Sequence, residues 1–170
     1  LAQTLIKLTV PGIPDIYQGT ELWNLSLVDP DNRRAVDFTL RRKLLKELDH
    51  LSVEDILAGA DEGRPKLWTI RKALQLRQRK PALFGPHSTY KPLYAKGAEA
   101  EHVVAFSRRD AVITVVPRLI MGVANWDDTR VDIPKGNWRN ILTDELIAGG
   151  TIHIAEILSR FPVALLECKD

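Results

Sequence analysis

The chain has 170 residues, 45% hydrophobic and 27% charged, with a formal net charge of +2. This length holds one ordinary domain or two small ones, and the composition is typical of a globular protein. A charge balance this weak does not support nucleic-acid binding. Because no apolar run approaches the ~20 residues of a transmembrane helix, no membrane partner is expected.

The cysteine and histidine content gives no sign of a disulfide or a metal site. Cys168 is the only cysteine, which excludes an internal disulfide and fits a reducing, cytoplasmic compartment. The histidines are scattered, and none lies at the close spacing of a zinc site: His50, His87, His102 and His153. Neither a metal nor a cofactor is therefore expected.

The first 38 residues predict a helix, a strand and a long loop. Leucines at near-helical spacing predict a helix over residues 1–9, which ends at Pro11-Gly12. Residues 14–18 are β-prone and are closed by Gly19, which is typical of a strand in an α/β unit. Residues 19–38 show no hydrophobic period, so they form a loop whose apolar residues (Trp23, Leu25, Leu27, Val28) argue against disorder.

Helices are expected through most of residues 39–80. Leucines of residues 40–51 recur on one face, while the basic run Arg41–Lys43 lies on the opposite, solvated face. Ser52 is a candidate N-cap, because Asp55 follows it at the spacing of a capping box. A third helix is predicted over residues 66–79, and Pro81 closes it.

From residue 85 the pattern changes to short β-branched runs. These are HVVAF, AVITVV, RLIMGVA, TRVDI, WRNIL and PVALLEC. Turn signals separate them, including Arg109-Asp110, Asp127-Asp128, Pro134-Lys135-Gly136 and Gly149-Gly150. Short strands at such spacing predict an antiparallel β-sandwich over residues 85–170. The stretch TIHIAEILSR fits either a strand or a helical turn.

Two motifs resemble a known family of sugar-processing enzymes. PGIPDIYQGTELW resembles the last barrel strand of the α-amylase superfamily, where Tyr-Gln-Gly is followed by a Glu. LVDPDNRRAVDF resembles the loop of maltooligosyl trehalose synthases, with Ala35 where the family has a proline. Downstream stretches such as LRQRKPALF, IPKGNWRNILT and FPVALLE are also similar, so the resemblance spans nearly the whole chain.

The resemblance implies an α+β fold class, in which the last unit of a (β/α)8 barrel precedes an antiparallel β-sandwich. Residues 1–84 would be the C-terminal part of the barrel, with strand 14–18, substrate loop 19–38 and helices 39–80. Residues 85–170 would be the C-terminal β domain. The chain would be about the last quarter of such an enzyme, and the family's catalytic carboxylates would precede Leu1. No catalytic residue is therefore expected within it.

The loop is the predicted substrate site, because loops after barrel strands line active sites. Carboxylates and arginines bind sugar hydroxyls, and aromatic rings cover sugar faces. The predicted substrate-binding residues are Tyr17, Gln18, Glu21, Trp23, Asp29, Asp31, Asn32, Arg33 and Arg34. Each has a structural alternative. Glu21 and Asp15 could pair with arginines, Asp37 could cap a helix, and Trp23 could wedge the loop onto the barrel. Arg33 and Arg34 could form a structural ion network.

The leading functional hypothesis is the C-terminal region of an enzyme that converts the reducing-end α-1,4 bond of a maltooligosaccharide into an α,α-1,1 bond. The isolated chain is then expected to be inactive. With an unpaired strand, its residues 1–38 would rearrange, dock on the helices of residues 39–80, or self-associate with a second copy of the chain. Two alternatives remain open. One is a glucan-binding or structural module without chemistry, and the other is part of another α-amylase-superfamily hydrolase.

Overall fold

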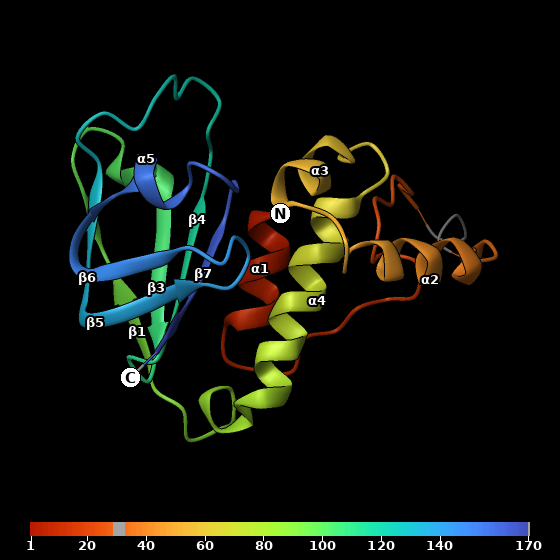
Figure 1. Ribbon diagram of the computed structural model, residues 1–170, viewed down its shortest axis with the longest axis horizontal. Helices are drawn as coiled ribbons and strands as arrows, with labels where there is room; N and C mark the ends of the chain where they lie inside the picture. Colours follow the sequence, from red (N-terminus) through yellow and green to blue (C-terminus); the bar gives the residue numbers. More distant parts are fainter. Residues whose placement is uncertain (29–32, 170) are drawn as a thin grey trace.

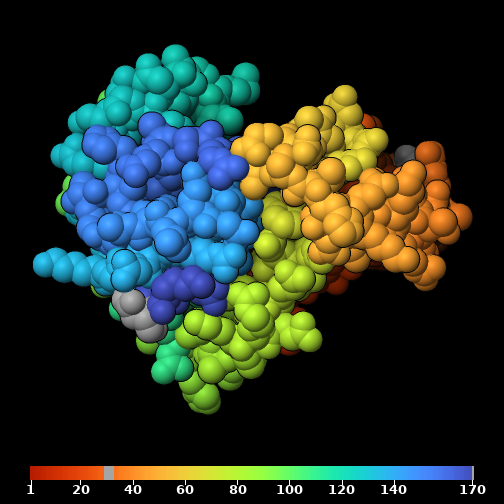
Figure 2. All heavy atoms as spheres, in the orientation of Figure 1, coloured from red at the N-terminus to blue at the C-terminus, as the bar shows by residue number. Residues whose placement is uncertain are grey.

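A computed structural model describes residues 1–28 and 33–169 of the chain, which form a helical part followed by an antiparallel sheet. Figure 1 shows the sheet on one side and α2 at the far end of the molecule, with α1 and α4 between them. The helices are α1 (Ala2–Thr9), α2 (Phe38–Glu47), α3 (Val53–Ala58), α4 (Arg64–Arg79) and α5 (Ile154–Ile157). In Figure 2 the α2–α3 part, orange to yellow, projects beyond the body of the sheet.

The helix ends follow local rules that the sequence signals. Asp37 caps α2, because its Oδ1 accepts a hydrogen bond of 2.8 Å from the backbone N–H of Leu40. Ser52 and Asp55 form the expected capping box at the start of α3. Both capping predictions are confirmed. α4 begins two residues earlier than predicted, at Arg64, with Pro65 in its first turn.

Seven strands form one antiparallel sheet. They are β1 (Tyr90–Leu93), β2 (Ala95–Lys96), β3 (Val103–Arg108), β4 (Val112–Pro117), β5 (Arg130–Asn140), β6 (Leu146–His153) and β7 (Ala164–Cys168). The strand order is β1-β3-β4-β7-β5-β2, and β6 pairs with β5 beside this path. The expected sandwich is therefore wrong in its architecture. A single curled sheet wraps around its own core, in which Trp138 is fully buried.

Two turn predictions fail inside the long strands. Pro134-Lys135-Gly136 lies within β5, at a register shift between Ile133 and Asn137 that marks a β-bulge. Gly149-Gly150 lies within β6, directly opposite. Of the predicted runs, RLIMGVA forms no strand. TIHIAEILSR contains both alternatives, since β6 ends at His153 and α5 follows at once.

The predicted strand over residues 14–18 is absent from this structure. The segment has no regular secondary structure up to Tyr17 and turns at Gln18, and in the described part of the chain it joins no strand ladder. The physical reason is that a strand needs a hydrogen-bonded neighbour, and the barrel strands proposed as its neighbours are not among these residues. The barrel unit remains a prediction.

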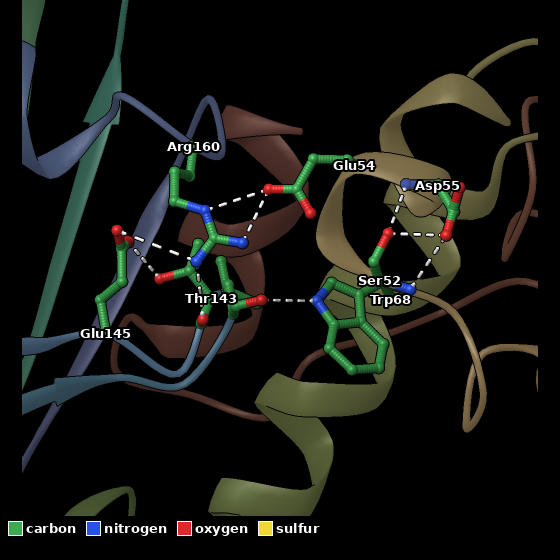
Figure 3. Close-up of polar contacts among 8 residues, drawn as sticks. Ser52, Glu54, Asp55, Trp68, Thr143, Glu145 and Arg160 are labelled. Atoms are coloured by element: carbon green, nitrogen blue, oxygen red, sulfur yellow. Dashed lines mark hydrogen bonds and ion pairs between the residues drawn. The ribbon is translucent and has the colours of Figure 1, made fainter.

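One hydrophobic core is shared by the helices and the sheet. It joins Leu5, Leu67 and Ile70 of the helices to Val112 of β4 and Leu165 of β7. Phe161, just before β7, also belongs to it. A polar junction lies at its edge (Figure 3), where the Trp68 indole N–H donates to the Leu142 carbonyl at 3.0 Å.

Arg160 extends this junction from the sheet side. Its guanidinium donates to Glu54 of α3 at 2.7 Å and lies 3.9 Å from Glu145 (Figure 3). The Arg160 hydrogen bond holds the pKa of Glu54 below its usual value. Core and junction together fix α3 and α4 against the sheet.

Two arginines hold the C-terminal end of α1. Arg77 of α4 donates to the carbonyls of Leu8 and Gly12, at 3.0 and 3.1 Å. Arg108 of β3 donates to the Thr9 carbonyl at 3.4 Å. Cations are favourable at a helix C-terminus, where carbonyls lack intrahelical partners. These contacts set the direction in which the chain leaves α1 and enters the long loop.

Candidate functional site

The candidate site is the loop between α1 and α2, described here over residues 13–28 and 33–37. Its first half runs beside α4, as the red trace in Figure 1 shows. Gly19 and Leu22 are buried in this half, and Leu22 belongs to the shared core. The Lys66 ammonium of α4 donates to the Leu22 carbonyl at 2.9 Å. The predicted site residues are therefore carried by a segment that α4 supports.

Trp23 is fixed to the turn between α3 and α4. Its indole N–H donates to the Ala60 carbonyl at 2.5 Å, and the Lys66 ammonium lies 5.6 Å from the ring centroid. Gly63 has a φ of +80° and lies so close that a Cβ there would be 3.2 Å from the Leu22 Cα. These contacts favour the wedge interpretation of Trp23. The side chain remains 43% exposed, so part of the ring is also available for stacking on a sugar.

Glu21 is held by Arg41 of α2, which the sequence placed on a solvated face. The carboxylate Oε2 accepts from the Arg41 Nε at 3.0 Å. Arg41 also donates to the carbonyls of Gly19, at 2.7 Å, and Asp37, at 3.1 Å. Its side chain is only 18% exposed. The structural alternative for Glu21, an ion pair with a nearby arginine, is the one seen.

Tyr17 and Gln18 lie at an exposed turn at the start of the loop. The Tyr17 carbonyl accepts from the Thr20 N–H at 3.0 Å and from the Thr20 hydroxyl at 2.6 Å. The Tyr17 side chain is 46% exposed, and Asp15 before it is exposed as well. The phenol is therefore presented at the surface by a locally closed turn.

The other predicted residues lie at the far side of the loop. Asp29, Asp31 and Asn32 fall outside the described residues. Arg33 and Arg34 are exposed, and each takes part in a polar or charged interaction. The structure thus groups Tyr17, Gln18, Glu21 and Trp23 on one arm of the loop and places the arginines on the other. The two arms meet at their base.

The base of the loop is a narrow neck. Gly19, at a φ of +89°, lies against Val36: a Cβ on Gly19 would be 3.1 Å from Val36 Cγ2 and 3.6 Å from Arg41 Nη2. Only glycine adopts this φ without strain. The sequence analysis missed Arg41 and Lys66 as parts of the site. Their partners lie 20 to 44 positions away, so no local pattern marks them.

The loop also exposes large apolar side chains. The exposed fractions are 97% for Ile13, 90% for Leu25, 92% for Leu27 and 63% for Val28. Apolar side chains exposed in a group are typical of contact surfaces. Next to the loop, a groove of about 530 Å³ runs between α2 and α4, lined by Glu21, Leu45, Leu67, Ile70, Arg71 and Leu74, among others.

Within residues 1–28 and 33–169, no three or more His, Cys, Asp and Glu side chains converge on a point where a metal ion could be held. None of the helices described there combines the length and the apolar character needed to cross a bilayer.

Comparison with known proteins identifies relatives, although no protein-family model matches the chain. A protein of Mycobacterium tuberculosis (strain H37Rv), provisionally named a maltooligosyl trehalose synthase, is 42% identical over 168 residues, which is 98% of this chain and 20% of that protein. The structure of maltooligosyltrehalose synthase from Arthrobacter ramosus is 40% identical, with a TM-score of 0.85 over 99% of this chain and 22% of its own.

A further crystal structure, of a maltooligosyl trehalose synthase, is 28% identical, with a TM-score of 0.75 over 98% of this chain and 21% of that one. The similarity covers helices and sheet alike. The chain spans about a fifth of the length of these relatives.

Proposed function

Because this chain is homologous to maltooligosyl trehalose synthases over 98% of its length, we propose that it forms the C-terminal region of such an enzyme. The observation that carries the proposal is the match across both the loop-bearing helical part and the curled sheet. The motif Asp-Pro-Asp-Asn-Arg-Arg at residues 29–34, which resembles the loop of this family, supports it. We infer a cytoplasmic location from the single cysteine of these 170 residues, which excludes a disulfide within them.

The proposed reaction of the complete enzyme is an intramolecular transglycosylation. A carboxylate attacks the anomeric carbon beside the reducing-end glucose, and a carboxylic acid protonates the departing glucose oxygen. The α-1,4 bond breaks and a glycosyl-enzyme forms. The freed glucose turns, and its anomeric hydroxyl attacks the same carbon while the second carboxylate takes the proton. The bond between the sugar and the carboxylate nucleophile breaks as the α,α-1,1 bond forms, which frees the nucleophile.

We place the two reacting carboxylates outside this chain. A retaining mechanism needs a nucleophile and an acid/base about 5–5.5 Å apart. Glu21, on the described arm of the loop, is engaged by Arg41 at 3.0 Å. A carboxylate that accepts a charged hydrogen bond from a guanidinium is already oriented by that contact. This supports a structural task for Glu21.

The task proposed for the loop is to wall the pocket that retains glucose between the two half-reactions. Water reaching the glycosyl-enzyme would give hydrolysis in place of the new linkage, so the pocket must exclude it. The exposed rings of Tyr17 and Trp23 can cover sugar faces. Arg33 and Arg34, with Asp29, Asp31, Asn32 and Gln18, would bind hydroxyls. The exposed apolar residues Ile13, Leu25, Leu27 and Val28 would contact the rest of the barrel.

Arg33→Ala in the full-length protein tests this function. With a maltooligosaccharide substrate, the unsubstituted protein is expected to form mainly the trehalose-type product. Arg33→Ala should raise the share of free glucose about tenfold, the effect of losing about 1.4 kcal/mol of differential stabilisation. Chromatography of the products measures both. Lys43→Ala, on the exposed outer side of α2, is the control and should leave the ratio unchanged. An Arg33→Ala ratio equal to that of the unsubstituted protein would contradict the task given to the loop.

A further inference from the structure

We propose that Arg41 is a positioning residue, which holds the two ends of the substrate loop together and thereby sets the shape of the sugar pocket. This inference rests on the function proposed above. It concerns a residue that touches no predicted substrate ligand other than Glu21, and that acts through the backbone of the loop.

Three contacts of one guanidinium join points that are far apart in sequence. Arg41 Nη2 donates to the Gly19 carbonyl at 2.7 Å, where the loop begins. Nη1 donates to the Asp37 carbonyl at 3.1 Å, where the loop ends. Nε donates to Glu21 at 3.0 Å, which secures the first arm. Two of the three donor nitrogens therefore bind the first arm of the loop, at Gly19 and Glu21, and the third binds its other end, at Asp37.

Geometry explains why arginine is required here. A guanidinium presents its donors in a rigid planar fork, whereas a lysine ammonium is a compact point charge on a flexible stem. The side chain projects from α2, whose first turn is capped by Asp37, so the fork starts from an ordered helix. Since the side chain is 18% exposed, water competes weakly for its donors.

The way in which the base of the loop is held limits the positions of the predicted sugar-binding residues. Gly19 and Val36 are in contact beside Arg41, so the loop is closed at its base. Arg34 precedes Asp37 by three residues, and three residues of extended chain span at most about 11 Å. The position of Arg34 is therefore limited by where the Asp37 end is held. On the other arm, Glu21 lies two residues before Trp23, which is itself fixed at Ala60.

The test compares identical substitutions at two neighbouring arginines of α2 in the full-length protein. Arg41→Lys and Arg41→Gln are expected to raise the ratio of free glucose to trehalose-type product about tenfold. Arg42→Lys and Arg42→Gln, at the exposed neighbour, should leave it unchanged. This ratio does not depend on how much of the enzyme is folded, so a general loss of stability cannot mimic the result. Unchanged ratios in both Arg41 variants would overturn the proposal.

A second measurement separates the positioning role from the proposed function. In the 170-residue chain, Arg41→Gln should speed backbone hydrogen exchange at least about tenfold in peptides covering residues 17–28, relative to Arg42→Gln. Exchange within α4 should stay the same. Equal exchange rates in the two variants would overturn the positioning role proposed for Arg41. Exchange could respond as expected while the unsubstituted full-length protein makes no trehalose-type product. In that case the proposed function fails and the positioning role of Arg41 stands.

Discussion

Trp138→Ala is expected to destabilise the protein by about 4 kcal/mol, within the range of about 3–5 kcal/mol for emptying a buried aromatic site. Trp138 is the largest of the fully buried side chains, and it lies in the core that the curled sheet encloses. Its indole N–H donates to the Pro134 carbonyl at 2.9 Å, across the bulge of β5. Alanine removes both the ring and this hydrogen bond. The bulge carbonyl is then left without its donor.

Urea unfolding followed by circular dichroism measures this effect in the 170-residue chain. The matched control is Trp126→Ala, because Trp126 is only partly buried at the edge of the same core. It should lose well under half as much stability. Equal losses for the two variants would show that the sheet does not close around Trp138 as described.

Gly149→Ala is expected to destabilise the protein by about 3 kcal/mol, at the upper end of the usual cost of overpacking. A Cβ at this position would lie 2.0 Å from the Pro134 carbonyl oxygen and 2.9 Å from the Lys135 Cα. Both atoms are backbone, so neither moves without opening the β5–β6 pairing. This is the pair of strands that supports one side of the Trp138 core.

Gly85→Ala is the matched control for this substitution. A Cβ there meets only the Pro81 carbonyl oxygen, at an ordinary contact distance of 3.7 Å. Its free energy of unfolding should change by less than about 0.5 kcal/mol, as at most surface positions. Unfolding of both variants in urea gives the comparison, and a Gly149→Ala protein as stable as the Gly85→Ala protein would refute the close approach at the bulge.

The bulge also shows where sequence reasoning failed for the sheet. Proline and glycine at 134–136 and 149–150 are ordinary turn signals, and they predict turns at both places. In the structure, residues 134–136 lie at the bulge of β5. Gly149 allows β6 to approach the backbone of this bulge closely. A local pattern cannot distinguish these uses, because the strand that approaches is distant in sequence. The helices were more predictable, since Ser52 and Asp37 act on their own next turn.

The candidate site was also predicted only in part from the sequence. The loop and its aromatic and charged residues could be predicted from the sequence, because these residues lie close together along the chain and form a recognisable motif. The neck at Gly19 and the Arg41 contacts were not, since they depend on how α2 returns to the start of the loop. The exposure of Leu25 and Leu27 was also missed. Apolar composition indicates that a surface will be covered, but not what covers it.

The central claim is that this chain shapes and holds a glucan, whereas the carboxylates that break its bonds lie outside it. The most direct test is to incubate the purified 170-residue chain with maltopentaose and analyse the products. We predict neither free glucose nor a trehalose-type product, under conditions where the full-length protein converts the substrate. Turnover by the 170-residue chain, abolished by replacing one of its own carboxylates, would contradict the claim.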